Sequence, residues 1–208
     1  MSWSQPVETY LDDLGAPTPA PGGGASSALA GAVGAAQLQM VVALTRANPS
    51  YAGVAGRMAE LEAALAADRA RFLALADEDA EAYGRVARAL KLPRATAAER
   101  AARSEELAAA LLGATGAPFA IMDLAVACLS LCGEVARTGT SMAASDVTVA
   151  AALLRAAVDG SVATVLANTR WMADRGLAAG LVARADANRG EGERLAASAI
   201  RRAEEDLR

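Results

Sequence analysis

Apolar side chains recur along the chain with the spacing of a helix that is buried on one face. The clearest stripe lies between residues 54 and 90 and reads Met58, Leu61, Leu65, Asp68, Phe72, Leu75, Asp79, Ala82, Val86, Ala89. Steps of three and four residues, which average 3.5, are typical of a helix packed in a bundle. We therefore predict one long helix here, with two carboxylates, Asp68 and Asp79, on its buried face.

The remaining helices are predicted from the same periodicity and from the residues that end helices. They cover residues 5–14, 25–46, 96–112, 119–137, 146–174 and 188–208. Thr96 with Glu99 forms a capping box, and Ser145 is the expected N-cap of the 146–174 helix. Alanine is abundant and only 3% of residues are aromatic, which favours helices over strands. The chain, residues 1–208, is thus expected to be one all-α domain, a bundle of six to seven helices.

The stretch from Gly22 to Thr45 carries no charge and is long enough to cross a bilayer. However, seven of its residues are Gly or Ser, and strongly inserting Leu, Ile and Phe are few. Gly31 and Gly34 would let another helix approach closely. We predict a tightly packed interior helix and no membrane span. The N-terminus lacks the basic and apolar regions of a signal peptide, so a cytoplasmic protein is expected.

Charge and missing residue types narrow the possible functions. The net charge is −4 and no basic stripe is present, so nucleic-acid binding is not expected. The sequence contains no histidine, which excludes Ser-His-Asp and Cys-His machinery and argues against a zinc site. No metal is therefore expected. Cys128 and Cys132, one helical turn apart, are interpreted as small core side chains.

Asp79 is the leading candidate for proton transfer. One interpretation is structural: Asp79 lies at the rim of the bundle or pairs with an arginine from another helix. The other is functional: Asp79 is a partly desolvated carboxylate in a cleft, and its pKa is raised. Asp68 lies between two arginines in sequence, which favours a structural role. Asn168 falls on the inward stripe of its helix and needs a hydrogen-bond partner, which could be backbone, a neighbouring helix or a ligand.

The run Pro21-Gly22-Gly23-Gly24 precedes a helix whose first backbone N–H groups are unpaired. It is either an entry turn that permits close helix contacts or a backbone path that shapes a pocket and can bind an anion. No Gly-Lys-Ser/Thr follows, so it is not a P-loop.

Taken together, these segments resemble the cyclodeaminase/cyclohydrolase family of folate enzymes. This family includes the cyclodeaminase domain of formiminotransferase-cyclodeaminase and stand-alone methenyltetrahydrofolate cyclohydrolases. The resemblance covers residues 17–174 and is most specific at 17–26, 30–36 and 40–45. Further matching pieces follow in order at 79–83, 92–93, Arg103, Pro118, 145–147, 150–151, Val165 and Asn168.

The resemblance implies an all-helical homodimer without metal or cofactor. It implies hydrolysis of 5,10-methenyltetrahydrofolate to 10-formyltetrahydrofolate, or ring closure of 5-formiminotetrahydrofolate with loss of ammonia. Asp79 would be the general acid–base, and Asp146 and Asn168 would orient substrate or water. The remaining implied contacts are with substrate: Pro21, Gly22, Gly23, Gly24 and Ser145 in the pocket, and Arg46, Lys91 and Arg103 at the glutamate tail.

Two positions differ from the family pattern. Only Arg46 is positive in residues 46–51, where many relatives carry a Gly/Lys-rich run, and Thr164 stands where relatives usually have Asn. No formiminotransferase domain is expected in this chain, which favours the cyclohydrolase over the cyclodeaminase. The competing hypothesis is a non-catalytic helical homodimer that keeps the scaffold as a binding or regulatory protein.

Overall fold

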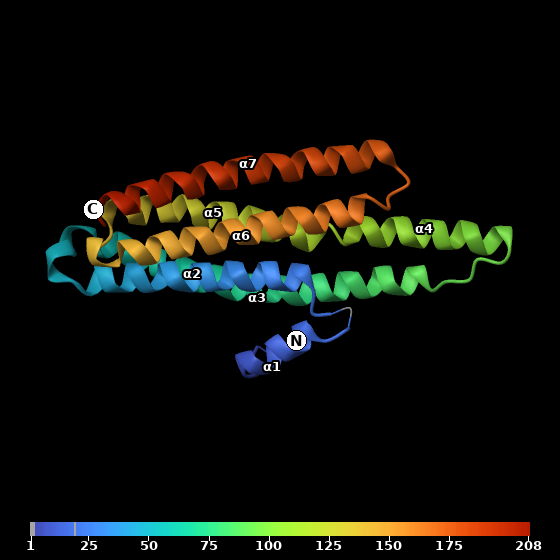
Figure 1. Ribbon diagram of the computed structural model, residues 1–208, viewed down its shortest axis with the longest axis horizontal. Coiled ribbons are helices and arrows are strands. Elements are labelled where there is room, and N and C mark those ends of the chain that lie inside the picture. Colours follow the sequence, from blue (N-terminus) through green and yellow to red (C-terminus); the bar gives the residue numbers. More distant parts are fainter. Residues whose placement is uncertain (1–2, 19) are drawn as a thin grey trace.

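The computed structural model describes residues 3–18 and 20–208, and these form long helices that lie side by side (Figure 1). Pro19, part of the run at 17–26, lies outside the described residues, as do residues 1 and 2. The elements are α1 (Val7–Gly15), α2 (Gly23–Ala47), η1 (Pro49–Val54), α3 (Ala55–Leu90), α4 (Ala97–Gly113), α5 (Gly116–Thr138), η2 (Ser141–Ala143), α6 (Ala144–Thr169) and α7 (Arg175–Glu205). No strand occurs among the described residues. The predicted all-α bundle is confirmed.

Helix α2 packs against both α3 and α6, and its glycines make this possible. A Cβ atom on Gly31 would lie 2.5 Å from the ring of Phe72 in α3, and one on Gly34 would lie 2.8 Å from the side chain of Leu154 in α6. Leu38 is fully buried. The predicted close packing of this helix is therefore confirmed on these two sides. Its third side is only partly covered: Val33 is 45% exposed and lines a groove together with Val7 and Tyr10 of α1.

Three stretches are long and apolar enough to cross a membrane by length and composition: Gly23–Ala47, Ala97–Thr138 and Ser141–Thr169. In the most apolar window of each, 50%, 50% and 44% of the residues are buried inside the bundle. About half of this apolar surface therefore serves contacts between the helices. The expectation that the Gly22–Thr45 stretch does not span a membrane stays a prediction.

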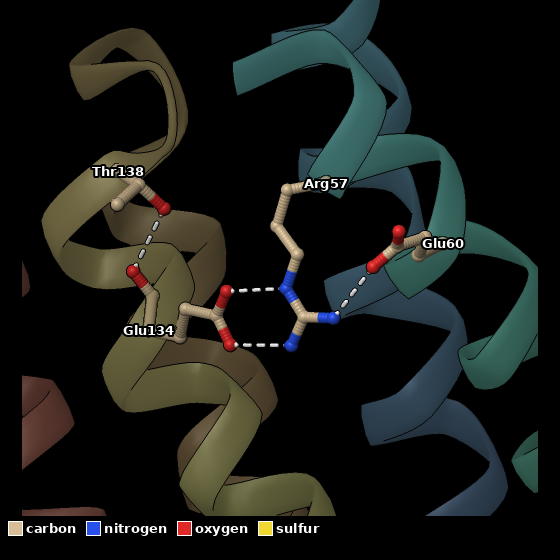
Figure 2. Close-up of polar contacts among 4 residues, drawn as sticks. All are labelled: Arg57, Glu60, Glu134 and Thr138. Atoms are coloured by element: carbon tan, nitrogen blue, oxygen red, sulfur yellow. Dashed lines mark hydrogen bonds and ion pairs between the residues drawn. The ribbon is translucent and has the colours of Figure 1, made fainter.

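Helix α3 is tied to α5 at the end of the bundle where α3 begins. The guanidinium of Arg57 donates two hydrogen bonds to Glu134, at 2.7 and 2.9 Å, and one to Glu60 at 2.9 Å (Figure 2). The Thr138 hydroxyl donates to the backbone carbonyl of Glu134. Since Arg57 binds the ionised form of Glu134, it lowers the pKa of that carboxyl group.

Helix α1 forms an arm beside the bundle, below α2 and α3 in Figure 1. The indole of Trp3 donates a hydrogen bond to Asp77 of α3 at 3.1 Å, and its ring lies 5.8 Å from that of Tyr10. Tyr10 is 4% exposed. The short helix predicted at 5–14 is thus present, and the segment after it leads directly into the glycine run.

Two predicted helix starts are wrong. Helix α6 begins at Ala144, because η2 runs directly into it, and Ser145 lies exposed within the first turn and caps nothing. Helix α7 begins at Arg175, 13 residues before the predicted start of the C-terminal helix at 188. Its buried face consists of glycine and alanine among many charges, which gives a weak apolar signal: Ala178, Ala185, Gly192, Ala196, Ala199 and Ala203.

The predicted capping box and buried cysteines are confirmed, whereas the start of α5 and the end of α6 differ from the predicted residues. Thr96 and Glu99 form the capping box, with hydrogen bonds of 3.2 and 2.8 Å. Cys128 and Cys132 are buried and free. Helix α5 starts at Gly116, so Pro118 lies in its first turn, where a missing N–H breaks no helical hydrogen bond. Helix α6 ends at Thr169 and not at residue 174.

Candidate functional site

A cleft of about 480 Å³ opens where the start of α2 meets α3 and the second half of α6. Its lining residues are Ala20, Gly22, Gly23, Gly24, Ala25, Asp79, Ala80, Tyr83, Gly160, Ala163, Thr164, Ala167 and Asn168. Three features that the sequence suggested independently, the glycine run, Asp79 and Asn168, therefore meet in one place. Pro21 lies in the turn between lining residues and is not itself among them.

The carboxyl group of Asp79 lies against the first turn of α2 at Gly24. A Cβ atom built on Gly24 would lie 2.1 Å from Oδ2 of Asp79, closer than any real contact. Gly23, by contrast, has nothing within 4 Å of such an atom. The glycine at position 24 is therefore required by the space that the carboxyl group occupies.

The start of α2 also carries unpaired backbone donors. The first hydrogen bond of the helix runs from the N–H of Ser26 to the carbonyl of Gly22, at 3.0 Å. The N-cap residue is Gly22, which has no side chain to accept from the N–H groups of the first turn. The N–H groups of residues 23–25 precede this bond and have no partner within the helix. Because this end of the helix dipole is positive, it favours negative charge nearby.

Asp79 itself is half-buried, and burial of its carboxyl group raises its pKa, because the carboxylate loses contact with water. No described residue forms an ion pair or hydrogen bond with it. The interpretation of Asp79 as an arginine-paired carboxylate therefore finds no partner within residues 3–18 and 20–208. A carboxylate whose pKa is raised in this way is a stronger base than a solvated one, and its charge attracts a cation.

Asn168 forms the far wall of the cleft on α6. Its Nδ2 donates to the backbone carbonyl of Ala114, between α4 and α5, at 3.0 Å. One turn earlier, the Thr164 hydroxyl donates to the carbonyl of Gly160 at 3.1 Å. A Cβ atom on Gly160 would lie 2.3 Å from Oγ of Ser27, so α2 and α6 approach closely at the base of the cleft.

Five sequence-predicted site residues lie outside the cleft, three of them at the opposite ends of α2 and α6. Asp146 is 22 residues before Asn168 on the same helix, which places it about 33 Å away along α6. It accepts a hydrogen bond of 2.7 Å from Gln37. Ser145 is beside it, and Arg46, at the last turn of α2, is paired with Glu62 at 2.8 Å. Within one chain these residues do not contribute to the Asp79 cleft.

Lys91 and Arg103 lie beyond the cleft, where α3 leads into α4. Lys91 is exposed and 12 residues after Asp79, about 18 Å along the helix. Arg103 donates to the carbonyl of Leu90 at 3.3 Å, and its Nε is buried without a partner. Both cations are therefore outside the lining of the cleft.

Some residues of the site were missed at the sequence level. Gly160 was not considered, and Thr164 was noted only as a difference from the family pattern; they precede Asn168 by eight and four residues, so helical spacing could have placed both at the site. The Ala114 carbonyl gives no sequence signal. Asp68, in contrast, lies within 3.5 Å of the Cys128 thiol and away from the cleft, as expected for a structural carboxylate. Among the described residues, no group of three Cys, Asp or Glu side chains is placed to hold a metal.

Known proteins are similar to this chain in sequence and in fold. The sequence profile of the formiminotransferase-cyclodeaminase family matches residues 6–187. A methenyltetrahydrofolate cyclohydrolase from Methylorubrum extorquens is 32% identical over 86% of this chain and 86% of its own length. The formimidoyltransferase-cyclodeaminase of Mus musculus is 32% identical over 79% of the chain, and the match spans 30% of that longer protein.

A solved structure matches nearly the whole molecule. The crystal structure of formiminotetrahydrofolate cyclodeaminase from Thermotoga maritima superposes with a TM-score of 0.82 and covers 98% of this chain and 96% of its own. At 24% identity it shows that the two proteins share a fold. With the family profile and the relatives, the conclusion is direct: the chain belongs to the formiminotransferase-cyclodeaminase family.

Proposed function

We propose that this protein hydrolyses 5,10-methenyltetrahydrofolate to 10-formyltetrahydrofolate in the Asp79 cleft. The observation that carries the proposal is the unpaired, half-buried carboxyl group of Asp79, held against Gly24 and facing a cleft that Asn168 also lines. The relative matched over most of both chains is named a methenyltetrahydrofolate cyclohydrolase, which supports this reaction.

The proposed substrate is a cation, and this suits the charge of the cleft. The methenyl carbon bridges N5 and N10 in an amidinium, whose positive charge an ionised Asp79 would stabilise. An arriving cation would in turn favour the ionised form of Asp79 and lower its raised pKa. Burial disfavours the ionised form of Asp79, and the bound cation would therefore make this ionised form favourable.

The reaction needs one base and one water. The water oxygen adds to the methenyl carbon, and Asp79 accepts one of the two water protons. The C–N5 bond then breaks, the remaining hydroxyl proton moves to N5, and the carbon becomes the formyl group on N10. Asp79 releases its proton to solvent, so one proton is produced for each substrate hydrolysed.

The other site residues take roles that follow from their positions. Asn168 would orient the substrate or the water, and Gly22 to Gly24 would form the wall against which the ring lies. Lys91 and Arg103 would meet the glutamate tail, since about 18 Å along α3 separates Asp79 from Lys91. We propose that the reaction needs no metal or cofactor and takes place in the cytoplasm.

The second reaction to be tested is cyclodeamination. The relatives named formimidoyltransferase-cyclodeaminase favour it, although the chain spans about a third of their length. In the same cleft, Asp79 would accept the proton of N10 as this nitrogen attacks the carbon of the protonated formimino group, and would pass that proton to the amino group that leaves. Ammonia would then leave, and the bridged cation would form.

We further propose that the protein is a homodimer paired through α2 and α6, which pack together and form one side of the bundle in Figure 1. The outward side chains of these helices include exposed apolar residues: Val33, Met40, Leu44, Val149 and Leu166. Helix α2 carries no charge before Arg46. An uncharged face as long as that of α2 is unusual on a monomer, and pairing it with its own copy would cover it.

Light scattering on the purified protein tests the dimer. The expected mass is twice the 21.0 kDa of the chain. Val33→Glu should give the monomer mass, because a charge would be buried between the copies. Leu207→Glu, a comparable change at an exposed position after the end of α7, should remain dimeric. A monomeric wild type contradicts the proposal.

Loss of methenyltetrahydrofolate absorbance, followed with and without purified protein, tests the hydrolysis. The expected result is acceleration well above the spontaneous rate, with 10-formyltetrahydrofolate as product. Release of ammonia from 5-formiminotetrahydrofolate is measured in parallel and identifies a cyclodeaminase. A pure, folded protein that accelerates neither reaction supports the competing hypothesis of a non-catalytic helical binding protein.

A further inference from the structure

The hydrogen bond from Asn168 to Ala114 joins two parts of the chain that are 54 residues apart, at the wall of the cleft. A carbonyl oxygen can only accept, so the amide atom that faces it must be the NH₂ group. Ala114 is buried, and its carbonyl would lose a partner if Asn168 turned around. The orientation of the Asn168 amide is therefore set by the junction between α4 and α5.

This orientation decides what Asn168 offers to a ligand. With Nδ2 committed to Ala114, Oδ1 remains as an acceptor, and no described residue donates to it. Thr164 similarly gives its hydroxyl proton to Gly160 and keeps only its acceptor capacity. With the carboxylate of Asp79, three side chains lining the cleft present acceptors to whatever binds there.

We propose that the Ala114 carbonyl is a positioning group that holds Asn168 so that Oδ1 accepts a hydrogen bond from an N–H of the substrate. This inference rests on the proposed function for the identity of the substrate, whose reduced pterin ring carries such N–H donors. Ala114 does not touch the substrate, and it acts only through Asn168.

The pH dependence of the Asn168→Asp variant tests whether the hydrogen bond to the Ala114 carbonyl positions the side chain at 168. The ionised carboxyl group cannot donate to Ala114, whereas the protonated form can donate its O–H and still present an acceptor to the cleft. The charged or titratable groups near this position are Asp79 and Tyr83 on α3, and Arg170 and Arg175 after the last turns of α6. Residues 110–118 contribute none. Ionised Asp79 would raise the pKa of the introduced group.

The expected readout is the ratio of kcat/KM between Asn168→Asp and the wild type. At pH 8 the ratio should fall about ten- to hundredfold below one, the usual effect of losing a hydrogen bond to a buried partner. It should rise towards one as pH falls, because the variant and the wild type then share the same active form. Asn168→Leu should give a low ratio that does not change with pH.

Asn188→Asp is the matched control, since Asn188 of α7 donates to Asp123 of α5 at 2.8 Å and neither residue lines the cleft. It should keep wild-type kcat/KM across the same pH range. A ratio for Asn168→Asp that stays flat with pH, as for Asn168→Leu, overturns the proposal.

Thermal unfolding gives a readout that does not depend on activity. The difference in Tm between Asn168→Asp and the wild type should narrow as pH falls, because the protonated group restores the bond to Ala114. A difference independent of pH overturns the positioning role. If the wild type hydrolyses no folate, the proposed function fails and the acceptor role fails with it, while the Tm difference still decides whether Ala114 positions Asn168.

Discussion

Gly24 and Asp79 occupy the same small volume: a Cβ atom at position 24 would lie 2.1 Å from Oδ2 of Asp79. The glycine run and the carboxylate are 55 residues apart in sequence, yet neither position can change without affecting the other. This contact fixes where the carboxyl group lies relative to the start of α2, and it accounts for a glycine that turn formation alone would not require.

Gly24→Ala should therefore displace the Asp79 carboxyl group and lower kcat/KM by about a hundredfold, since misplacement of a reacting group by about 1 Å has effects of this size. Gly23→Ala places its methyl group in open space, so its kcat/KM should fall clearly less than that of Gly24→Ala. Gly180→Ala in α7, also in open space, serves as the activity control. Similar losses for the substitutions at 23 and 24 would contradict the steric account.

The pKa of Asp79 predicts how stability depends on pH. Burial raises this pKa above the unfolded value of 3.8, so the folded state holds the proton more tightly than the unfolded state. The contribution of Asp79 to stability therefore falls as pH rises from about 3.8 through the folded pKa. Asp79→Asn removes this loss and should raise Tm at pH 7 to 8, by about 2–4 °C for each kcal/mol.

Circular dichroism melts of both proteins between pH 4 and 8 measure this effect. The Tm difference should be largest at the alkaline end and shrink as pH falls through the folded pKa, because the wild-type carboxyl group then also becomes neutral. A variant that is less stable than the wild type at pH 8 would show that Asp79 is stabilised by its surroundings, against the assignment made here.

The contact between Gly31 and Phe72 predicts a large effect on the fold itself. Gly31→Ala places a methyl group 2.5 Å from the ring, which must shift, and we expect a loss of about 1–3 kcal/mol in the free energy of unfolding. Gly180→Ala makes the same change in a helix with open space and should stabilise slightly. Urea unfolding of the two variants compares them directly, and equal effects would rule out the close packing of α2 on α3.

The Arg57–Glu134 pair gives a pH effect of the opposite sign (Figure 2). Because Arg57 lowers the pKa of Glu134, the pair stabilises the protein above the unfolded pKa of 4.5, and this contribution is lost as pH falls through the folded pKa. Glu134→Gln should lower Tm slightly at pH 7, a few degrees at most for a pair this exposed. The Tm difference should shrink as pH falls through the folded pKa of Glu134, and a difference that does not change with pH would assign the effect to packing.

Much of the fold could be predicted because its signals are local. The apolar stripe of α3 and the capping box at Thr96 each lie within a few turns of one helix. The start of α7 could not be predicted, because the residues that it buries against α5 and α6 are mostly alanine. Alanine is only weakly apolar, so the helix shows no clear apolar stripe among its charged residues. Ser145 has the right side chain for an N-cap, but η2 supplies the preceding turn and α6 starts at Ala144, two residues before the predicted start.

The site was predictable only in part for a similar reason. Gly24, Asp79 and Asn168 each stood out from their own helices, and the structure brings them together. Asp146 stood out equally, yet one chain holds it about 33 Å from Asn168, since both lie on α6. The Ala114 carbonyl could not be predicted, because every residue carries one and only the packing of the helices shows which one meets a side chain.

The rate of methenyltetrahydrofolate hydrolysis by Asp79→Asn, set beside that of Asp68→Asn, tests the central claim most directly. Both substitutions make the same chemical change on the same face of α3, three turns apart, and only Asp79 lines the cleft. We predict that Asp79→Asn loses at least a hundredfold in kcat, as expected for removal of a general base, while Asp68→Asn keeps near wild-type activity. Equal rates for the two variants would contradict the assignment of Asp79 as the base.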